Sequence, residues 1–293
     1  MRVGVIDVGS NTIRLLVARQ GDNGPVRLRV ERAYLRLAAE ILARGEIGEE
    51  KLAEAAQVVG AYAALARRLG AARTEVVVTA PGRHAANPEE LAHVLARAAR
   101  APVHLLTGEE EGRLAYEGAI ALAGDLARTV AVCDVGGGST ELVVGEPPSP
   151  PSWSGSVDVG TLALTASLLP SDPPADAELA AAAREVELRL SELGPPRPLG
   201  ALAVGGSARG LARIVGATLG PAELDEALRL AGRSPAAKLA RRYGIDRERA
   251  RVLPAGALVL REIVRRLGLP LELARGGLRE GIAAVLLAEA EAA

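Results

Sequence analysis

The sequence predicts an α/β protein made of two halves with the same order of elements, because one short phrase occurs twice in register. Residues 7–17 align with residues 134–144 at a constant offset (134 − 7 = 127). Each copy is an apolar run ending in an aspartate, Asp7 or Asp134, then a turn of Gly, Ser, Asn or Thr, then a second apolar run. This pattern predicts a strand, a tight turn and a strand. A repeat of this kind constrains the whole architecture.

In the first half, short apolar runs predict strands, and apolar residues at helical spacing predict helices. The expected order is βββαβαβα, with residues 35–44 as a short helix or loop. The first long helix ends at Gly70, a favourable C-terminal cap, and the next begins with Asn87 as N-cap and Pro88 at its first position. Strands are expected at 3–7, 13–19, 26–33, 75–79 and 103–106, and helices at 49–69, 88–100 and 108–123.

The second half repeats this order from about Gly124 onward. A length of 293 residues fits two domains, which we place at 1–123 and 124–293. Strands are expected at 129–133, 140–145, 153–159, 199–204 and 271–274, and helices at 177–193, at 208–215, within 221–267 and at 278–291.

The repeated turn has the chemistry of a phosphate site. Glycines permit positive φ and close approach of the backbone to a ligand, and successive N–H groups of such a turn bind anions. Asp7 and Asp134 would repel a bare phosphate, so we expect them to bind Mg²⁺ or to orient water. Ordinary β-hairpin turns are the alternative. The predicted phosphate-binding residues of the two turns are Ser10, Asn11, Gly136, Gly137, Gly138 and Ser139.

Composition limits the classes of protein. The net charge is −1, so a nucleic acid or other polyanion would need a local basic groove. The single cysteine, Cys133, lies in an apolar strand and excludes an intrachain disulfide, which fits a reducing cytoplasm. No apolar run of membrane-spanning length and no signal-peptide pattern occurs, so we expect a cytoplasmic protein without a membrane partner.

Further segments carry candidate site residues. Glu109, Glu110 and Glu111 open a predicted helix, where helix-dipole and capping effects favour acids. Three in a row leave at least one to point elsewhere, into the site. Arg83 follows a strand's carboxyl end, where α/β sheets bind ligands. Two more glycine turns precede helices: Gly205-Gly206-Ser207, where we expect Gly206 and Ser207 to bind phosphate, and residues 274–281.

The doubled βββαβαβ order resembles the superfamily of actin, sugar kinases and DnaK-type chaperones. This resemblance implies two ribonuclease-H-like (actin-like ATPase) domains of βββαβαβ order facing across a cleft. Within it, the chain resembles the exopolyphosphatase / guanosine pentaphosphate phosphohydrolase family, in a short two-domain form. The matching phrases are Ile6-Asp7-Val8-Gly9-Ser10-Asn11-Thr12-Ile13-Arg14-Leu15-Leu16, Arg83-His84-Ala85-Ala86-Asn87, Gly108-Glu109-Glu110-Glu111-Gly112-Arg113-Leu114, Asp134-Val135-Gly136-Gly137-Gly138-Ser139-Thr140-Glu141-Leu142-Val143, Gly205-Gly206-Ser207 and Gly276-Gly277-Leu278-Arg279-Glu280-Gly281.

The resemblance implies a Mg²⁺-dependent hydrolase that removes terminal phosphate from inorganic polyphosphate. It gives Glu111 the role of catalytic base, Arg83 that of phosphate clamp, and Asp134 and Glu141 that of an acidic pair near Mg²⁺ and the water. Such chemistry needs charge neutralisation and a positioned water. A guanosine pentaphosphate 5′-phosphohydrolase is the close alternative, and the scarcity of aromatics for a guanine pocket favours polyphosphate slightly.

Two other classes stay open. A phosphotransferase would need an acceptor site, for which no motif is visible. A non-catalytic polyphosphate or nucleotide sensor is kept open by Ala163, which stands where the family often has arginine. The sequence leaves the oligomeric state open, with a homodimer as one option.

Overall fold

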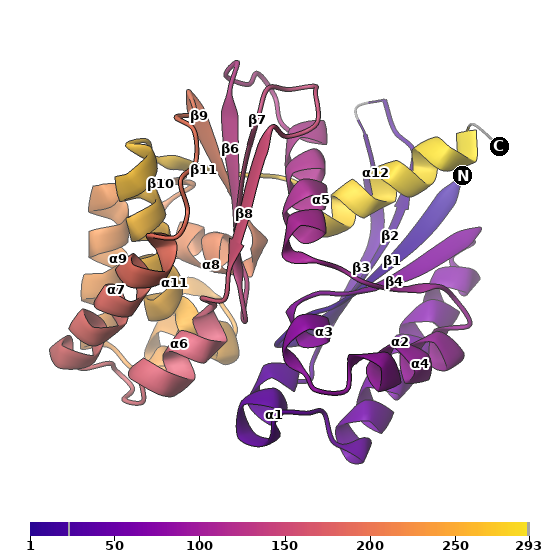
Figure 1. Ribbon diagram of the computed structural model, residues 1–293, viewed down its shortest axis with the longest axis horizontal. Helices are drawn as coiled ribbons and strands as arrows, with labels where there is room; N and C mark the ends of the chain where they lie inside the picture. Colours follow the sequence, from indigo (N-terminus) through magenta and orange to yellow (C-terminus); the bar gives the residue numbers. More distant parts are fainter. Residues whose placement is uncertain (23, 292–293) are drawn as a thin grey trace. The chain divides into compact units, whose positions relative to one another are not determined.

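The computed structural model describes residues 1–22 and 24–291. The chain divides into two compact units, each with its own sheet (Figure 1). Unit 1 consists of Met1–Leu122 and Gly276–Ala293, and unit 2 of Ala123–Arg275. No helix of the described residues is long and apolar enough to cross a membrane.

Unit 1 contains a five-stranded sheet in the order β3-β2-β1-β4-β5. The strands β1, β2 and β3 form antiparallel pairs, and β4 and β5 run parallel to β1. The strands are β1 (Arg2–Val8), β2 (Thr12–Arg19), β3 (Val26–Tyr34), β4 (Arg73–Val78) and β5 (Val103–Leu105). The helices are α1 (Leu37–Arg44), α2 (Glu49–Arg68), α3 (Ala80–His84), α4 (Pro88–Ala99), α5 (Gly108–Ala121) and α12 (Leu278–Glu291).

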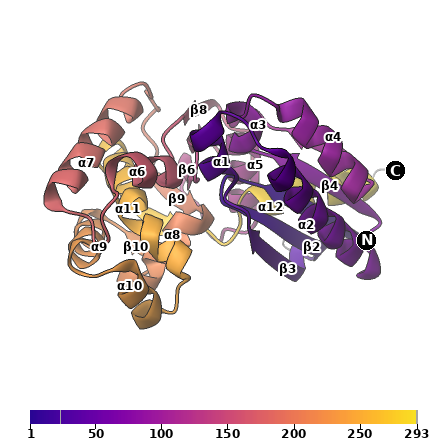
Figure 2. The ribbon, with the colours of Figure 1, turned by 90° about the horizontal axis from the view of Figure 1, so that it is seen from below.

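Alternation along β1 assigns its side chains to two faces of the sheet. Ile6 and Val8 pack with the apolar residues of α2 and α4 in one core cluster. Because successive strand residues point to opposite faces, Val5 and Asp7 point away from α2. The helix α12 contacts β1 and β2 and packs closely with α5. Figure 2 shows α2 and α4 beside the sheet of this unit.

Unit 2 contains a six-stranded sheet in the order β10-β11-β9-β6-β7-β8. Its strands are β6 (Val130–Val135), β7 (Thr140–Gly145), β8 (Trp153–Val157), β9 (Gly200–Val204), β10 (Thr218–Leu219) and β11 (Leu271–Leu273). Its helices are α6 (Thr161–Leu168), α7 (Asp176–Leu190), α8 (Gly205–Val215), α9 (Pro221–Arg233), α10 (Ala236–Tyr243) and α11 (Arg247–Leu267).

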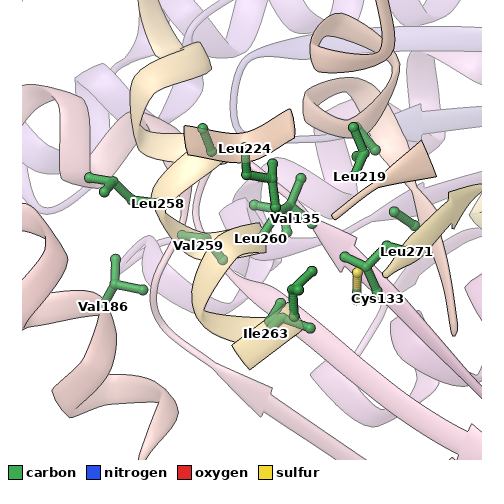
Figure 3. Packing of buried hydrophobic residues seen from close by; sticks show 14 of the residues in the cluster. Cys133, Val135, Val186, Leu219, Leu224, Leu258, Val259, Leu260, Ile263 and Leu271 are labelled. Atoms are coloured by element: carbon green, nitrogen blue, oxygen red, sulfur yellow. The ribbon is translucent and has the colours of Figure 1, made fainter. Parts of the chain in front are cut away.

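The long helix α11 forms the centre of the unit 2 core. Its residues Val259, Leu260 and Ile263 belong to the same buried cluster as Cys133 and Val135 of β6 (Figure 3). Cys133 is fully buried, and burial raises the pKa of its thiol far above the ordinary value. The cysteine is therefore a core residue, as its apolar neighbours in the sequence predict.

The two sheets confirm the predicted repeat. In unit 1, β1, β2 and β3 form an antiparallel meander, with β4 parallel to β1 and β5 parallel to β4. In unit 2, β6, β7 and β8 form the same meander, with β9 parallel to β6 and β11 parallel to β9. The sequence missed three short elements, α3, α6 and β10, which are too short for a periodic signal.

The structure corrects the predicted C-terminal domain of 124–293, because residues 276–293 group with unit 1. The reason is that the backbone at Gly276 and at Gly281 of α12 closely approaches the backbone of α5. A Cβ built on Gly276 would lie 1.9 Å from the carbonyl oxygen of Gly118, and one on Gly281 would lie 1.9 Å from that of Leu114. Unit 1 is therefore discontinuous in sequence, which the order of elements alone does not reveal.

Candidate functional site

The two repeated turns have the same geometry. In unit 1 the Gly9 N–H donates to the carbonyl oxygen of Thr12 at 3.1 Å, and in unit 2 the Gly136 N–H donates to that of Ser139 at 2.9 Å. Both donors and both acceptors are separated by the offset of the sequence repeat. Thr12 and Ser139, the equivalent acceptor residues, are both buried, and so is Ser10.

The carbonyl oxygens of the unit 1 turn are bonded to the chain that follows β3. The N–H groups of Leu35 and Arg36 donate to the Asn11 oxygen at 3.0 and 3.1 Å, and that of Ala38 donates to the Ser10 oxygen at 2.9 Å. Carbonyl oxygens repel an anion, so holding them toward the protein favours anion binding by the turn's amides. The side-chain Oδ1 of Asn11 is buried without a hydrogen-bond partner among the described residues, and it needs a donor or cation from outside the chain.

The carbonyl oxygens of the unit 2 turn are bonded in the same manner, by the start of α6. The N–H groups of Thr161 and Leu162 donate to the oxygens of Gly136 and Gly137, both at 2.9 Å. A Cβ on Gly160 would lie 2.3 Å from the Gly137 oxygen, so only glycine fits there. The helix α6, which the sequence did not predict, thus supports the second turn.

The aspartates of the two turns have cross-strand partners of opposite charge to each other, one basic and one acidic. Asp7 pairs with Arg14 across β1 and β2, whereas Asp134 pairs with Glu141 at the same register position of β6 and β7. Ser156 donates to Oε1 of the buried Glu141 at 3.0 Å. Unit 1 therefore has an acid–base pair where unit 2 has two carboxylates.

Burial raises the pKa of Asp7, while the guanidinium groups of Arg14 and Arg279 act to lower it. Burial, together with Arg14, lowers the pKa of Arg279, and Glu280 and Asp7 oppose that shift. An arginine stays protonated in either case. On balance the pKa of Asp7 is raised, because burial outweighs the attraction of the two guanidinium groups.

Arg83 and Glu111 meet in unit 1. Oε2 of Glu111 lies 2.9 Å from Nη1 of Arg83, and the same nitrogen donates to the carbonyl oxygen of Leu106 at 3.1 Å. Glu111 has 8% of its surface exposed. Arg83 lies on α3, directly after β4, and Glu111 lies on the first turn of α5, which follows β5. The parallel order β1-β4-β5 brings both residues to the sheet edge that carries the first turn.

The three consecutive glutamates have three different environments. Glu109 is exposed. Glu110 accepts from the Thr107 N–H at 2.8 Å, while the Glu110 N–H donates to the Thr107 hydroxyl, which completes a capping box. Only Glu111 is buried against a cation. Of the three, Glu111 is the one that meets Arg83, and its role in the site stays a prediction.

The glycine turn after β9 lies beside Asp134. A Cβ on Gly205 would lie 2.3 Å from Oδ1 of Asp134, and Gly205 has φ +84°. Ser207 is buried, and its hydroxyl donates to the carbonyl oxygen of Val135 at 3.1 Å. A Cβ on Gly206 would lie 2.0 Å from Nη1 of Arg249, so that guanidinium lies directly over the Gly206 backbone.

The donor sets decide where a Mg²⁺ ion fits. Among residues 1–22 and 24–291 there is no group of three or more His, Cys, Asp or Glu side chains suited to a metal. Mg²⁺ commonly uses one or two carboxylates and completes its shell with water and substrate phosphates. Asp134 and Glu141 satisfy that requirement. The expectation that Asp7 binds the ion stays a prediction, and Arg14 and Arg279 oppose the binding of a further cation there.

Sequence reasoning missed two arginines, Arg249 and Arg279. Arg249 lies on the first turn of α11 in a stretch with no glycine signature, so no pattern marked it. Arg279 lies within the glycine phrase of residues 274–281, which indicates a turn and no role for the arginine. Arg249 reaches the Gly206 turn from a helix distant in sequence, and the charge of Arg279 acts on Asp7.

The doubled sheet topology and the paired glycine turns define a protein of the actin-like ATPase fold with phosphate-site chemistry in each unit. The chain belongs to the Ppx/GppA phosphatase family, because the sequence model of that family matches residues 16–290. The resemblance found in the sequence is confirmed, and the chain is accordingly an enzyme of the phosphoanhydride hydrolase class.

Individual relatives agree with this family. The chain is 31% identical over 306 residues to exopolyphosphatase 1 of Mycobacterium tuberculosis, covering 96% of this chain and 87% of the relative. It is 35% identical over 198 residues to exopolyphosphatase 2 of the same species, covering 64% of this chain and 61% of the relative. The crystal structure of the Aquifex aeolicus Ppx/GppA family member matches with a TM-score of 0.83 and 26% identity, covering 100% of this chain and 98% of that one.

Proposed function

We propose that the protein is a Mg²⁺-dependent exopolyphosphatase that releases terminal phosphate from inorganic polyphosphate. The observation that carries the proposal is the buried Glu111 at 2.9 Å from Arg83, at the sheet edge that carries the first glycine turn. A base and a phosphate-binding guanidinium at one place are what phosphoanhydride hydrolysis requires. The names of the mycobacterial relatives support polyphosphate as the substrate.

In the proposed reaction Glu111 accepts a proton from water, and the water oxygen attacks the terminal phosphorus. The bond from that phosphorus to the bridging oxygen breaks, and the shortened polyphosphate leaves with the electron pair. Arg83 and the two glycine turns hold the phosphate oxygens and neutralise their charge.

Asp134 and Glu141 would hold the Mg²⁺ ion, which supplies additional neutralisation of phosphate charge when bound. Asp134 lies beside the Gly205 turn, and Glu141 is kept in place by the Ser156 hydroxyl. We assign Asp7 to the internal balance of unit 1 instead of to the metal. Arg249, over the Gly206 backbone, is a further phosphate ligand in this proposal.

Guanosine pentaphosphate is the alternative substrate, and a sensor without catalysis is the alternative class. Ala163 bears on the sensor. Its N–H lies 3.4 Å from the Gly137 oxygen in the first turn of α6, so it replaces a family arginine close to the second turn. Glu111, Asp134 and Glu141 together support catalysis, because a binder gains nothing from carboxylates facing phosphate.

The test is phosphate release from long-chain polyphosphate and from guanosine pentaphosphate, each with Mg²⁺ and with EDTA. We expect Mg²⁺-dependent release that is faster from polyphosphate. Faster release from guanosine pentaphosphate would make that compound, and not polyphosphate, the substrate. Tight binding of either compound without phosphate release would show that the protein is a sensor and not an enzyme. The variant Ala163→Arg would then be tested for recovered hydrolysis.

Location in the cytoplasm is part of the same proposal. The single thiol of Cys133 and the near-zero net charge support a protein that works in a reducing compartment on a small or linear phosphate substrate.

A further inference from the structure

A cavity of about 680 Å³ lies among three helices of unit 2. It is lined by residues of α7, α9 and α11 and by the connection from α11 to β11, residues 268–270. Its volume falls within the roughly 300–1,000 Å³ that small-molecule sites have. Of the described residues that line it, none is a candidate phosphate, metal or catalytic residue. The cavity is therefore separate from the site described above.

Much of the cavity lining is apolar and continuous with the core of unit 2. Leu258 and Val264 of α11 are buried members of the main core cluster, and Ala183 of α7 and Leu269 pack against that cluster. The first residue of α9, Pro221, adds a further apolar side chain. An apolar molecule placed against these residues would be removed from water, which is the usual source of affinity in such sites.

Each acidic side chain among the described lining residues lies next to an arginine. Nη1 of Arg261 on α11 lies 3.2 Å from Oδ1 of Asp225 on α9. Arg265 donates to both carboxylate oxygens of the buried Glu262, each at 2.6 Å, and its Nη2 lies 3.8 Å from Oε1 of Glu187 on α7. These contacts join α11 to both neighbouring helices and balance the three carboxylates.

The lining residue Arg184 of α7 adds a positive charge that no acid balances. It is exposed, and it has no hydrogen-bond or ion-pair partner in the part of the chain that the structure describes. Glu262 also accepts from Nε of Arg266 at 2.7 Å, so four guanidinium groups around the cavity face three carboxylates. One positive charge is therefore in excess, beside an apolar lining. A guanidinium in this setting favours a single carboxylate or sulfonate.

We propose that this cavity binds a small amphipathic monoanion, which has one carboxylate or sulfonate group on an apolar body. The charged group lies on Arg184, and the apolar body lies against Leu258, Val264 and Leu269. Polyphosphate does not fit this lining, because burying its many charges against apolar side chains is costly. The inference concerns unit 2 alone and does not rest on the proposed hydrolysis.

The experiment uses 8-anilinonaphthalene-1-sulfonate, an aromatic monoanion whose fluorescence increases in apolar surroundings, as the probe on the native full chain. We expect saturable binding of one probe molecule per chain. Octanoate should displace the probe. Acetate lacks the apolar body and octylammonium has the opposite charge, so neither should displace it. Tripolyphosphate should not displace it either, because no candidate phosphate residue lines the cavity.

The variant Arg184→Gln should bind the probe about tenfold more weakly, the factor expected for loss of one charge-assisted hydrogen bond. Because Arg184 is exposed and makes no contact of this kind with the described chain, its melting temperature should stay that of the wild type. Arg189→Gln is the matched control. Arg189 is exposed on the same helix outside the lining, with its Nε 2.8 Å from Oε1 of Glu185, and its variant should bind the probe like the wild type.

Several results would overturn the inference. They are the absence of saturable probe binding, equal binding by Arg184→Gln and the wild type, and displacement by octylammonium as effective as that by octanoate. Displacement by tripolyphosphate would instead assign the cavity to the phosphate site. Loss of probe binding as the protein concentration rises would assign it to contact with a second copy of the chain, and either result would also overturn the inference.

Discussion

Replacing Glu111 by glutamine tests proton transfer with little change in shape. The amide keeps the size of the carboxylate but cannot accept a proton from water at neutral pH. Arg83 retains its bond of 3.1 Å to the Leu106 oxygen, so the guanidinium has a second anchor after its charged partner is lost. The substitution should therefore remove the base and leave the phosphate-binding group in position.

The expected loss follows from these contacts. A positioned general base contributes about 10²–10⁴-fold to the rate, which corresponds to about 2.7–5.4 kcal/mol of barrier at 1.36 kcal/mol per tenfold. We expect kcat of Glu111→Gln to fall by that factor. KM should stay the same or decrease, because Glu111, at 2.9 Å from Arg83, no longer competes with phosphate for that guanidinium.

The assay is steady-state release of phosphate from polyphosphate of defined length with Mg²⁺ in excess. Glu109→Gln is the matched control, since Glu109 lies on the same helical turn but is exposed. It should stay within about twofold of the wild type, as surface substitutions do. If Glu111→Gln retains wild-type kcat, or if both variants lose activity equally, the assignment of the base is wrong.

Three further predictions concern stability and reactivity. Glu110→Ala should destabilise the protein by about 1 kcal/mol through loss of the capping box. Backbone hydrogen bonding lowers the pKa of Glu110, so its contribution is present above pH ~4.5 and lost as pH falls through the lowered value. The melting temperatures of the wild type and the variant should therefore converge in acid. Gly160→Ala should abolish substrate binding or folding, because the new Cβ would lie 2.3 Å from the Gly137 oxygen. The control Gly124→Ala, whose new Cβ has no atom within 4 Å, should have the melting temperature of the wild type. Equal melting temperatures and equal substrate binding of the two variants would refute the argument. Cys133 should react with a thiol reagent only after denaturation, since burial raises its pKa; rapid labelling of the native protein would contradict this.

The two turns and the Glu111 helix could be predicted from sequence because their signals are local. Asp7 and Asp134 each end an apolar strand run immediately before a glycine-containing turn, and each copy of the turn makes the same N–H to carbonyl bond. Glu110 and Glu111 could be separated in principle by the capping-box spacing from Thr107, which assigns Glu110 to the helix end. Contacts between residues that are close in sequence can therefore be predicted from the order of residue types.

The partners that cross the fold could not be predicted in this way. Arg249 reaches Gly206 from a helix more than forty positions later, and Arg279 reaches the Leu15 oxygen of β2 from near the end of the chain. Their positions depend on how distant helices pack, and such packing leaves no regular interval between residues in a single sequence. The placement of α12 in unit 1 depends likewise on Gly118 and Gly281, whose contact is visible only in three dimensions.

The discontinuity of unit 1 has a consequence for biosynthesis. A ribosome delivers the chain from its N-terminus, and domains generally begin to fold as they emerge. The sheet face that carries Val5 and Asp7 therefore stays uncovered by α12 while all of Ala123–Arg275 is synthesised. During that interval β1 and β2 lack their contacts with α12, and apolar strand residues are open to water and to other nascent chains. The enzyme should therefore depend on translation speed and on chaperones more than its two small sheets suggest.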